Sequence, residues 1–266
     1  MKIGILGGAG RMGQILAREI LSKKYPATLA AAVDHKKSWA LGKDMGGILG
    51  VDPCGVCVTT QKDDAFRVSD VLIDFTTADA TVEHAGLAHQ YGKAIVIGTT
   101  GLGEVEMAAI KSASLKAPVL QAANMSVGVN LLLSFVEKAA GMLGVDYDIE
   151  IFEAHHRHKI DAPSGTALAL GHAAAKGRKV KLEDALVPAR FGQIGARPEG
   201  AIGMSVFRGG DVVGDHTVTF AGTGERIEFA HKANDRSLFA KGAVTAAMWL
   251  GGKPAGLYSM RDVLGL

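Results

Sequence analysis

The sequence predicts an α/β protein with a doubly wound parallel sheet followed by a second α+β domain that contains an open mixed sheet. Three observations predict this fold class. Apolar strands alternate with helical patterns over residues 1–126, which is typical of a parallel sheet covered by helices on both faces. A glycine-rich loop, GGAGRMG, separates the first strand from the first helix. From residue 147 onward, polar and apolar residues alternate between glycine-rich turns, as expected for strands with one exposed face.

The first half of the chain repeats strand and helix signals. Residues 2–6 form a short apolar strand, and apolar residues from Met12 to Ile20 then recur at the spacing of one helix face. Residues 28–33 form a second buried strand that ends at Asp34, so the first unit is strand, helix, strand. The later elements expected in this half are a strand at 71–75, a helix at 79–91, a strand at 94–97, a helix at 104–116 and a strand at 119–122.

The second half begins with a long apolar helix at 127–143. Ser164 is a suitable N-cap for a further helix that ends at Gly177, whereas residues 177–200 show no period and are expected to be a loop. A helix at 237–250 is expected to pack back on the first domain. The strands expected here are 147–153, 202–207, 215–221 and 226–230, and the predicted domains are 1–126, joined by 236–266, and 127–235.

The composition excludes some classes of function. The 29 Lys and Arg residues nearly balance the 27 Asp and Glu residues, so the net charge of +2 does not favour a nucleic-acid binder. No apolar run approaches the roughly 18 residues of a membrane span, and the N-terminal segment reads as a strand instead of a targeting signal. We therefore expect a soluble cytoplasmic protein that uses neither a membrane nor a nucleic acid.

The two cysteines, Cys54 and Cys57, have the spacing of a redox pair or of half a zinc site. A redox pair of the thioredoxin type begins a helix, but the residues after Cys57 continue as a strand. A zinc site needs two more ligands, and the chain has no second cysteine pair. We expect neither chemistry at these positions.

The glycine loop predicts a dinucleotide site. It reads as G-x-G-x-x-G from Gly8, or as G-x-x-G-x-x-G from Gly7, and Asp34 follows the last glycine by about 20 residues. Glycines let the backbone approach a pyrophosphate, which the amides of a helix N-terminus stabilise, and an acid at the end of the second strand binds ribose hydroxyls. The alternative is a tight turn with no ligand.

The residues near Asp34 bear on the choice of cofactor. A carboxylate disfavours a 2′-phosphate, whereas His35, Lys36 and Lys37 would attract one, so we expect NAD to bind, with NADP also possible. Two further loops, GTTG at 98–101 and AAN at 122–124, follow later strands at the edge where such sheets bind ligands. Each could equally be an ordinary turn.

The segment EAHHRHKIDAPSGT, residues 153–166, combines cations with a helix start. If it is extended, His155, Arg157 and Lys159 share one face, and the other two histidines share the opposite face. Two cations beside His155 disfavour a metal ion, and the patch lacks the interleaved aromatic residues of a nucleic-acid site. A solvated strand end is one reading. The other is a site for a carboxylate substrate, with His and Lys as proton donors and the amides of Gly165 and Thr166 as anion ligands.

Several motifs together resemble the dihydrodipicolinate reductase (4-hydroxy-tetrahydrodipicolinate reductase) family of lysine and diaminopimelate biosynthesis. These are GGAGRMG, DFT at 74–76, GTTG, AANMSVGVN, EAHHRHKIDAPSGTAL, GDHTVTF, GERIEFAHKA and MRDVLGL. The resemblance covers essentially the whole chain, and its most specific part is HHRHK-x-DAPSGT. It implies a Rossmann-like N-terminal domain that binds the dinucleotide, and a second domain that binds substrate and mediates oligomerisation.

The resemblance also implies an activity and site residues. The activity is hydride transfer from NADH or NADPH to C4 of a cyclic imine dicarboxylate, with loss of water, in a homotetramer built through the sheet of the second domain. His155 would be the general acid or base and Lys159 a proton donor, although either could protonate the substrate, and His156, Gly165 and Thr166 would hold its carboxylates. The cofactor residues would be Gly7, Gly8, Ala9, Gly10, Arg11, Met12, Asp34, Gly98, Thr99, Thr100, Ala122, Ala123, Asn124 and Met125.

One departure from the family pattern leaves the cofactor preference open. Some relatives have arginine directly after the acid of the second strand, where this chain has His35 before Lys36. Two alternative functions also fit parts of the sequence: another oxidoreductase with the same glycine pattern, or a regulator that senses NAD without chemistry. The first would not need two carboxylate sites, and the second would not need clustered His and Lys.

Overall fold

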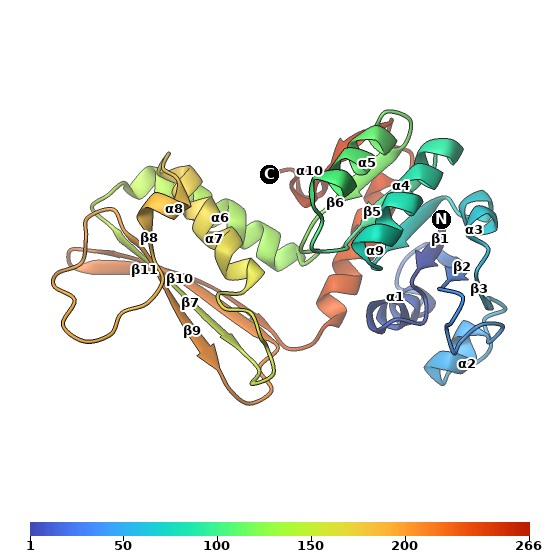
Figure 1. The fold of residues 1–266 in the computed structure, drawn as a ribbon, viewed down its shortest axis with the longest axis horizontal. Coiled ribbons are helices and arrows are strands. Elements are labelled where there is room, and N and C mark those ends of the chain that lie inside the picture. The colour runs from blue at the N-terminus through green and yellow to red at the C-terminus, as the bar shows by residue number, and fades with distance from the viewer. The chain divides into compact units, whose positions relative to one another are not determined.

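The computed structural model describes residues 1–266 and divides into two compact units. The first unit consists of Met1–Val127 and Ser237–Leu266, and the second of Gly128–Arg236. Figure 1 shows a sheet with helices in each of them. None of the helices combines the length and the apolar content that a membrane span needs.

The first unit contains a seven-stranded, entirely parallel sheet in the order β12-β6-β5-β4-β1-β2-β3. The strand order reverses beside β1, which places a topological switch point at the carboxyl ends of β1 and β4. The strands β4 and β5 are buried throughout, as expected for a parallel sheet covered on both faces. The strands are β1 (Lys2–Leu6), β2 (Thr28–Val33), β3 (Val58–Thr59), β4 (Val71–Asp74), β5 (Ala94–Ile97), β6 (Pro118–Gln121) and β12 (Gly256–Tyr258).

Helices cover both faces of this sheet (Figure 1). One apolar core joins the sheet to α1 (Arg11–Leu21), α2 (Met45–Leu49), α9 (Ser237–Leu250) and α10 (Met260–Leu264). A second core on the opposite face joins it to α3 (Lys62–Val68), α4 (Ala78–Tyr91) and α5 (Glu104–Ser114). The doubly wound sheet predicted from the sequence is therefore confirmed.

The second unit contains a five-stranded mixed sheet in the order β11-β10-β7-β9-β8. The strand β10 is antiparallel to both neighbours, whereas β7, β9 and β8 are parallel. Side chains of α6 (Val127–Leu143) and α7 (Gly165–Gly177) share one apolar core with this sheet. The strands are β7 (Asp148–His155), β8 (Leu186–Val187), β9 (Ile202–Arg208), β10 (Gly214–Gly222) and β11 (Glu225–Ala233), which confirms the open mixed sheet.

The segment 177–200 is less irregular than predicted. It contains α8 (Leu182–Ala185) and the strand β8, which pairs with β9 through two residues only. Elements this short carry no period in the sequence, so a loop was the wrong expectation for them. The rest of the segment is fixed by two arginines, because Arg190 and Arg197 both bind the carboxylate of Glu150 on β7.

Four other short elements, α2, α3, β12 and α10, were not predicted, for the same reason. The longer elements agree closely with expectation: β5, α6 and α9 have the predicted bounds, and Ser164 is the N-cap of α7.

Candidate functional site

The glycine loop after β1 is packed too closely to accept side chains. Gly7 has a φ of +81°, in the left-handed region that favours glycine. A Cβ atom on Gly13 would lie 2.1 Å from the carbonyl oxygen of Gly7 and 2.6 Å from that of Gly8. Because both neighbours are backbone atoms, the loop would have to move. The first turn of α1 is thus pressed against the loop.

The amides of the loop itself are mostly used within the protein. Gly7 and Gly8 donate to the carbonyl oxygen of Val33, and Gly10 donates to that of Gly7. The amides that begin α1, at Arg11 and Met12, precede the first intrahelical hydrogen bond, which Gln14 donates to Gly10. The structure therefore offers the helix start, more than the loop amides, to an anion such as a pyrophosphate.

Asp34 lies at the carboxyl end of β2 and fixes the same loop. One carboxylate oxygen accepts from the amide of Ala9 at 2.8 Å, and the other accepts from the amide of His35 at 2.7 Å. The side chain is only 9% exposed, whereas that of His35 is 73% exposed. Each carboxylate oxygen retains a second lone pair, so Asp34 can still accept from ribose hydroxyls.

The loops after β5 and β6 lie at the same edge of the sheet, but not all of their side chains face outward. A Cβ on Gly98 would lie 2.3 Å from the ring of Phe75, so a larger residue there would have to displace that ring. Thr99 is buried and its hydroxyl lies 3.0 Å from that of Thr81, while Met125 is 1% exposed. Thr99 and Met125 could therefore contact a ligand only through backbone atoms, unlike the exposed Thr100.

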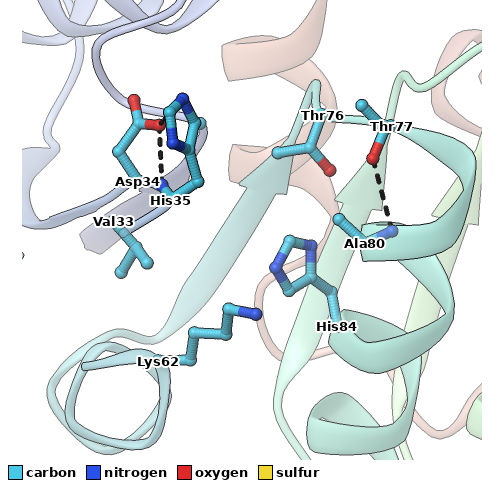
Figure 2. A pocket seen from close by; sticks show the side chains of 9 residues that line it. Val33, Asp34, His35, Lys62, Thr76, Thr77, Ala80 and His84 are labelled. Carbon is cyan, nitrogen blue, oxygen red and sulfur yellow. Dashed lines mark hydrogen bonds and ion pairs between the residues drawn. The ribbon is translucent and has the colours of Figure 1, made fainter. Parts of the chain in front are cut away.

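A cavity opens beside Asp34, between the end of β2 and the start of α4. Figure 2 shows Val33, Asp34 and His35 on one side and Thr77, Ala80 and His84 on the other, with Lys62 between them. The cavity has a volume of about 140 Å³, which is smaller than a typical site for a whole drug-sized ligand. It adjoins the glycine loop at Gly7.

In the second unit, the residues predicted to be catalytic surround the end of β7. His155 is the last residue of this strand, and its Nδ1 atom lies 2.5 Å from Oε2 of Glu153. Glu153 is 1% exposed and also binds both terminal nitrogens of Arg208 at 2.8 Å and the amide of Ser164 at 3.0 Å. Burial alone would raise the pKa of Glu153, but the hydrogen bonds from Arg208, His155 and Ser164 hold it below its ordinary value.

The cluster after His155 is a turn, so the expectation of two alternating faces is wrong. Lys159 donates its amide to the carbonyl oxygen of His156, and Arg157 and His158 form the turn between them. The Lys159 ammonium is bound by both carboxylate oxygens of Asp161, at 2.7 and 2.9 Å. A run of five polar and charged residues gives no apolar alternation, and the turn leaves Arg157 and His158 exposed to solvent.

His156 lies beside other cations in this turn. Partial desolvation, together with the charges of Arg236, His158, His155 and Lys159, holds the pKa of His156 below its ordinary value. Its ring centroid is 6.3 Å from that of His158. An excess of positive charge of this kind favours an anionic ligand.

Ser164 connects the turn to α7. Its hydroxyl accepts from the amide of Ala167 at 3.1 Å and lies 3.0 Å from Nε2 of His216 on β10. Burial and the neighbouring His155 lower the pKa of His216 from 6.5 to about 4, so this ring is neutral beside His155. The helix that Ser164 caps begins with Gly165 and Thr166, as predicted.

Sequence reasoning missed the residues that support these side chains. Glu153 was not singled out, although alternation along β7 places it on the same buried face as Ile149 and Ile151. An acid on a buried face needs a cationic or donor partner, and this signal was available. Arg208 and His216 could not be assigned as the partners, because only the pairing of β7 with β9 and β10 brings them close.

The whole chain is similar to known proteins. Family models described as "Dihydrodipicolinate reductase, N-terminus" and "Dihydrodipicolinate reductase, C-terminus" match residues 1–125 and 128–264. Proteins named 4-hydroxy-tetrahydrodipicolinate reductase from Methylocella silvestris and Brucella abortus are each 50% identical to this chain over 100% of its length, covering 97% and 99% of their own.

Solved structures resemble the fold. A dipicolinate-bound dihydrodipicolinate reductase from Paenisporosarcina sp. TG-14 has a TM-score of 0.78 at 23% identity, covering 98% of both chains. An amine dehydrogenase from Mycobacterium smegmatis has a TM-score of 0.62 at 11% identity, covering 98% of this chain and 95% of its own. At these identities the likeness concerns the fold alone.

Proposed function

This chain belongs to the dihydrodipicolinate reductase family, and on that premise we propose how its residues carry out the reaction of the family. It is an NAD(P)H-dependent oxidoreductase that reduces 4-hydroxy-tetrahydrodipicolinate in lysine and diaminopimelate biosynthesis. The observation that carries the catalytic part of the proposal is the contact between His155 and Glu153, because it gives the histidine a fixed orientation in a cationic site.

The first unit suits a dinucleotide, NADH or NADPH, whose reduced nicotinamide supplies the hydride. The amides of Arg11 and Met12 would hold the pyrophosphate at the start of α1, and Asp34 would accept from the ribose. The close packing of Gly13 on the loop supports this assignment, because it leaves no side chain between a phosphate and the helix start. We propose that the loops at 98–100 and 122–125 contribute backbone contacts.

The second unit suits a dicarboxylate. His156 and the helix start at Gly165 and Thr166 would bind its two negative charges. In this way the unit neutralises a doubly charged ring before electrons are added to it. We propose that residues 127–235 form the substrate-binding domain and that 1–126 with 236–266 form the cofactor-binding domain.

The reaction needs proton transfers that His155 and Lys159 can provide. Loss of water from the ring removes a proton and a hydroxide, and hydride addition then requires that a proton be returned to the ring. An ionised carboxylate can only accept, so Glu153 holds the proton of His155 on Nδ1 and leaves Nε2 as the atom that exchanges protons. We propose His155 as the general acid or base and Lys159, presented by Asp161, as the proton donor.

We further propose a cytoplasmic homotetramer built through the second sheet. Phe152 on β7 and Phe207 on β9 are 44% and 47% exposed, and their positions in the strand register place them on the face of the sheet opposite its apolar core. Exposed aromatic side chains on an open sheet favour contact with another copy of the chain. The free thiols of Cys54 and Cys57 agree with a reducing compartment.

The activity can be tested directly with the unstable substrate. It is generated in the cuvette from pyruvate and aspartate semialdehyde by the enzyme that condenses them, and oxidation of NADH or NADPH is followed by its nicotinamide absorbance. We expect oxidation only when all components are present. Absence of oxidation with either cofactor, in a protein that binds the cofactor, would contradict the proposed reaction.

A further inference from the structure

The buried carboxylate of Asp74 joins three segments of the first unit. Asp74 ends β4 and is fully buried. Its Oδ1 atom accepts from the amide and the hydroxyl of Thr76, at 3.0 and 2.6 Å. Its Oδ2 atom contacts the hydroxyl of Thr81 at 3.1 Å and Nδ1 of His84 at 2.9 Å, both on α4. Each oxygen therefore has a separate set of donors, which fixes the orientation of the carboxylate.

This arrangement determines which nitrogen of His84 carries its proton. An ionised carboxylate can only accept hydrogen bonds, so the Nδ1 atom must donate. In the neutral ring, Nε2 is then an acceptor. His84 is 3% exposed, and Figure 2 shows its ring projecting from α4 into the cavity beside Asp34. Asp74 thus presents a single, oriented acceptor to that cavity.

The walls of the cavity suit a flat heterocycle. Val33 and Ala80 supply apolar surface from its two sides, and Thr77 supplies a methyl group. The ammonium of Lys62, which also lines the cavity, is bound to Glu83 and so is already neutralised. Asp34 lies at the same cavity, where a ribose would bind, so the group that enters it is the base attached to that ribose.

We propose that His84, oriented by Asp74, is the residue that recognises the base of the dinucleotide, by accepting a hydrogen bond from the 6-amino group of adenine. The inference rests on the proposed function in so far as it takes the cofactor from it. His84 is the specificity-determining residue, and Asp74 is a positioning residue that acts through it. A purely structural histidine would satisfy Asp74 equally well, but it would not distinguish one purine from another.

Two dinucleotides that differ at one position test the proposal. Reduced nicotinamide hypoxanthine dinucleotide carries a carbonyl oxygen where NADH carries the 6-amino group. This oxygen and Nε2 of His84 are both acceptors, so no hydrogen bond can form between them. Dissociation constants for both are measured by fluorescence titration at pH 8, without substrate. We expect the wild-type protein to bind NADH roughly 10-fold or more tightly than the analogue, because a mismatched buried polar group is left unpaired.

The matched variants are His84→Ala and His89→Ala, which lie on the same helix. His89 contacts the carbonyl oxygen of Ser112 at 3.0 Å and does not line the cavity. We expect His84→Ala to bring the ratio of the two dissociation constants close to one and His89→Ala to keep the wild-type ratio. A His84→Ala protein with the wild-type ratio would overturn the proposal.

Asp74→Asn probes the orientation of the ring. Thr76 donates its amide and its hydroxyl to Oδ1, so the oxygen of Asn must take that place. The amide nitrogen of Asn would then face Thr81 and His84. The Nδ1 atom would then accept, Nε2 would carry the proton, and the preference should shift toward the hypoxanthine analogue. An unchanged preference in folded Asp74→Asn protein would overturn the role of Asp74.

The outcomes also separate this proposal from the proposed function. Equal and tight binding of both dinucleotides by the wild-type protein would overturn the recognition of adenine and leave the cofactor in place. Binding of neither dinucleotide would overturn the cofactor assignment and this proposal with it.

Discussion

The Nδ1 atom of His155 lies 2.5 Å from Oε2 of Glu153, and the same carboxylate binds both terminal nitrogens of Arg208. Glu153 therefore does for His155 what Asp74 does for His84: a buried acid at the end of a strand fixes the proton of an imidazole. In both places the donors come from neighbouring segments that only the folded sheet brings together. The second unit uses this device at the site where we place proton transfer.

The first prediction concerns Glu153→Gln, which keeps the shape of the side chain and removes its charge. An amide can donate to Nδ1, so the fixed orientation of the His155 proton is lost, and we expect kcat to fall roughly 10²-fold. Dinucleotide affinity should stay near wild type, because Glu153 lies in the second unit. Steady-state kinetics and NADH titration measure the two effects.

Glu153→Gln should also destabilise the protein, since it leaves the guanidinium of Arg208 without its anion, at a cost of about 3 kcal/mol. Denaturant unfolding measures this change and shows whether the variant is folded under assay conditions. A folded variant with wild-type kcat would contradict the role of Glu153.

The second prediction concerns the proposed proton donors. His155→Ala and Lys159→Ala should each lower kcat by roughly 10²-fold or more while leaving NADH affinity near wild type. Arg157→Ala is the control, because Arg157 is an exposed cation of the same turn with no assigned contact to substrate. A loss of NADH affinity in the two site variants as large as their loss of kcat would contradict the assignment of cofactor binding to the first unit and of proton transfer to the second.

The sequence could predict the main helices and strands of the fold, but not all of the residues that hold the site side chains in place. Helix 127–143 and strand 94–97 were predicted to the residue. The helix has a long apolar period, and the strand is a short, fully apolar run between glycines, so each pattern indicates one type of element. His155 and Lys159 could be proposed from local composition and from family resemblance. The partner of Glu153 could not, since Arg208 is 55 positions from Glu153 in sequence and reaches it only when β9 pairs with β7.

An acidic residue in an otherwise apolar strand is a sequence signal that could have identified these supporting contacts. Asp74 appeared only as part of the DFT motif, although it ends a strand that is otherwise entirely apolar. A carboxylate in that position must be satisfied by donors, and threonines at 76, 81 and 99 are the donors it finds. The identity of the donors depends on the contact between β4, β5 and α4, which no local pattern contains.

The third prediction concerns the glycine loop. Gly13→Ala would place a Cβ atom 2.1 Å from a backbone oxygen of Gly7, so the loop must shift away from the start of α1. We expect NADH affinity to fall at least 10-fold in isothermal titration, because the amides that would bind the pyrophosphate are displaced.

Gly47→Ala is the control for this prediction. Gly47 lies within the short helix α2, and an added Cβ there meets nothing within 4 Å. It should leave NADH affinity unchanged and stabilise the fold by about 0.5 kcal/mol. Wild-type NADH affinity in Gly13→Ala would contradict the assignment of the loop.

The last prediction concerns acid stability and His216. Burial, assisted by the charge of His155, lowers the pKa of this ring from 6.5 to about 4, so the folded protein holds it neutral in a range where the unfolded chain protonates it. The unfolded state therefore binds more protons between those two values, and stability falls as the pH is lowered from about 6.5 to about 4. This shift corresponds to a loss on the order of 3 kcal/mol across the window.

His216→Asn removes the titrating ring, so its unfolding free energy should change less than that of the wild type between the same pH values. The exposed His172 on α7 provides the control, since His172→Asn should keep the wild-type slope. Urea unfolding at a series of pH values measures the slopes. A wild-type slope in His216→Asn would show that other groups cause the acid sensitivity.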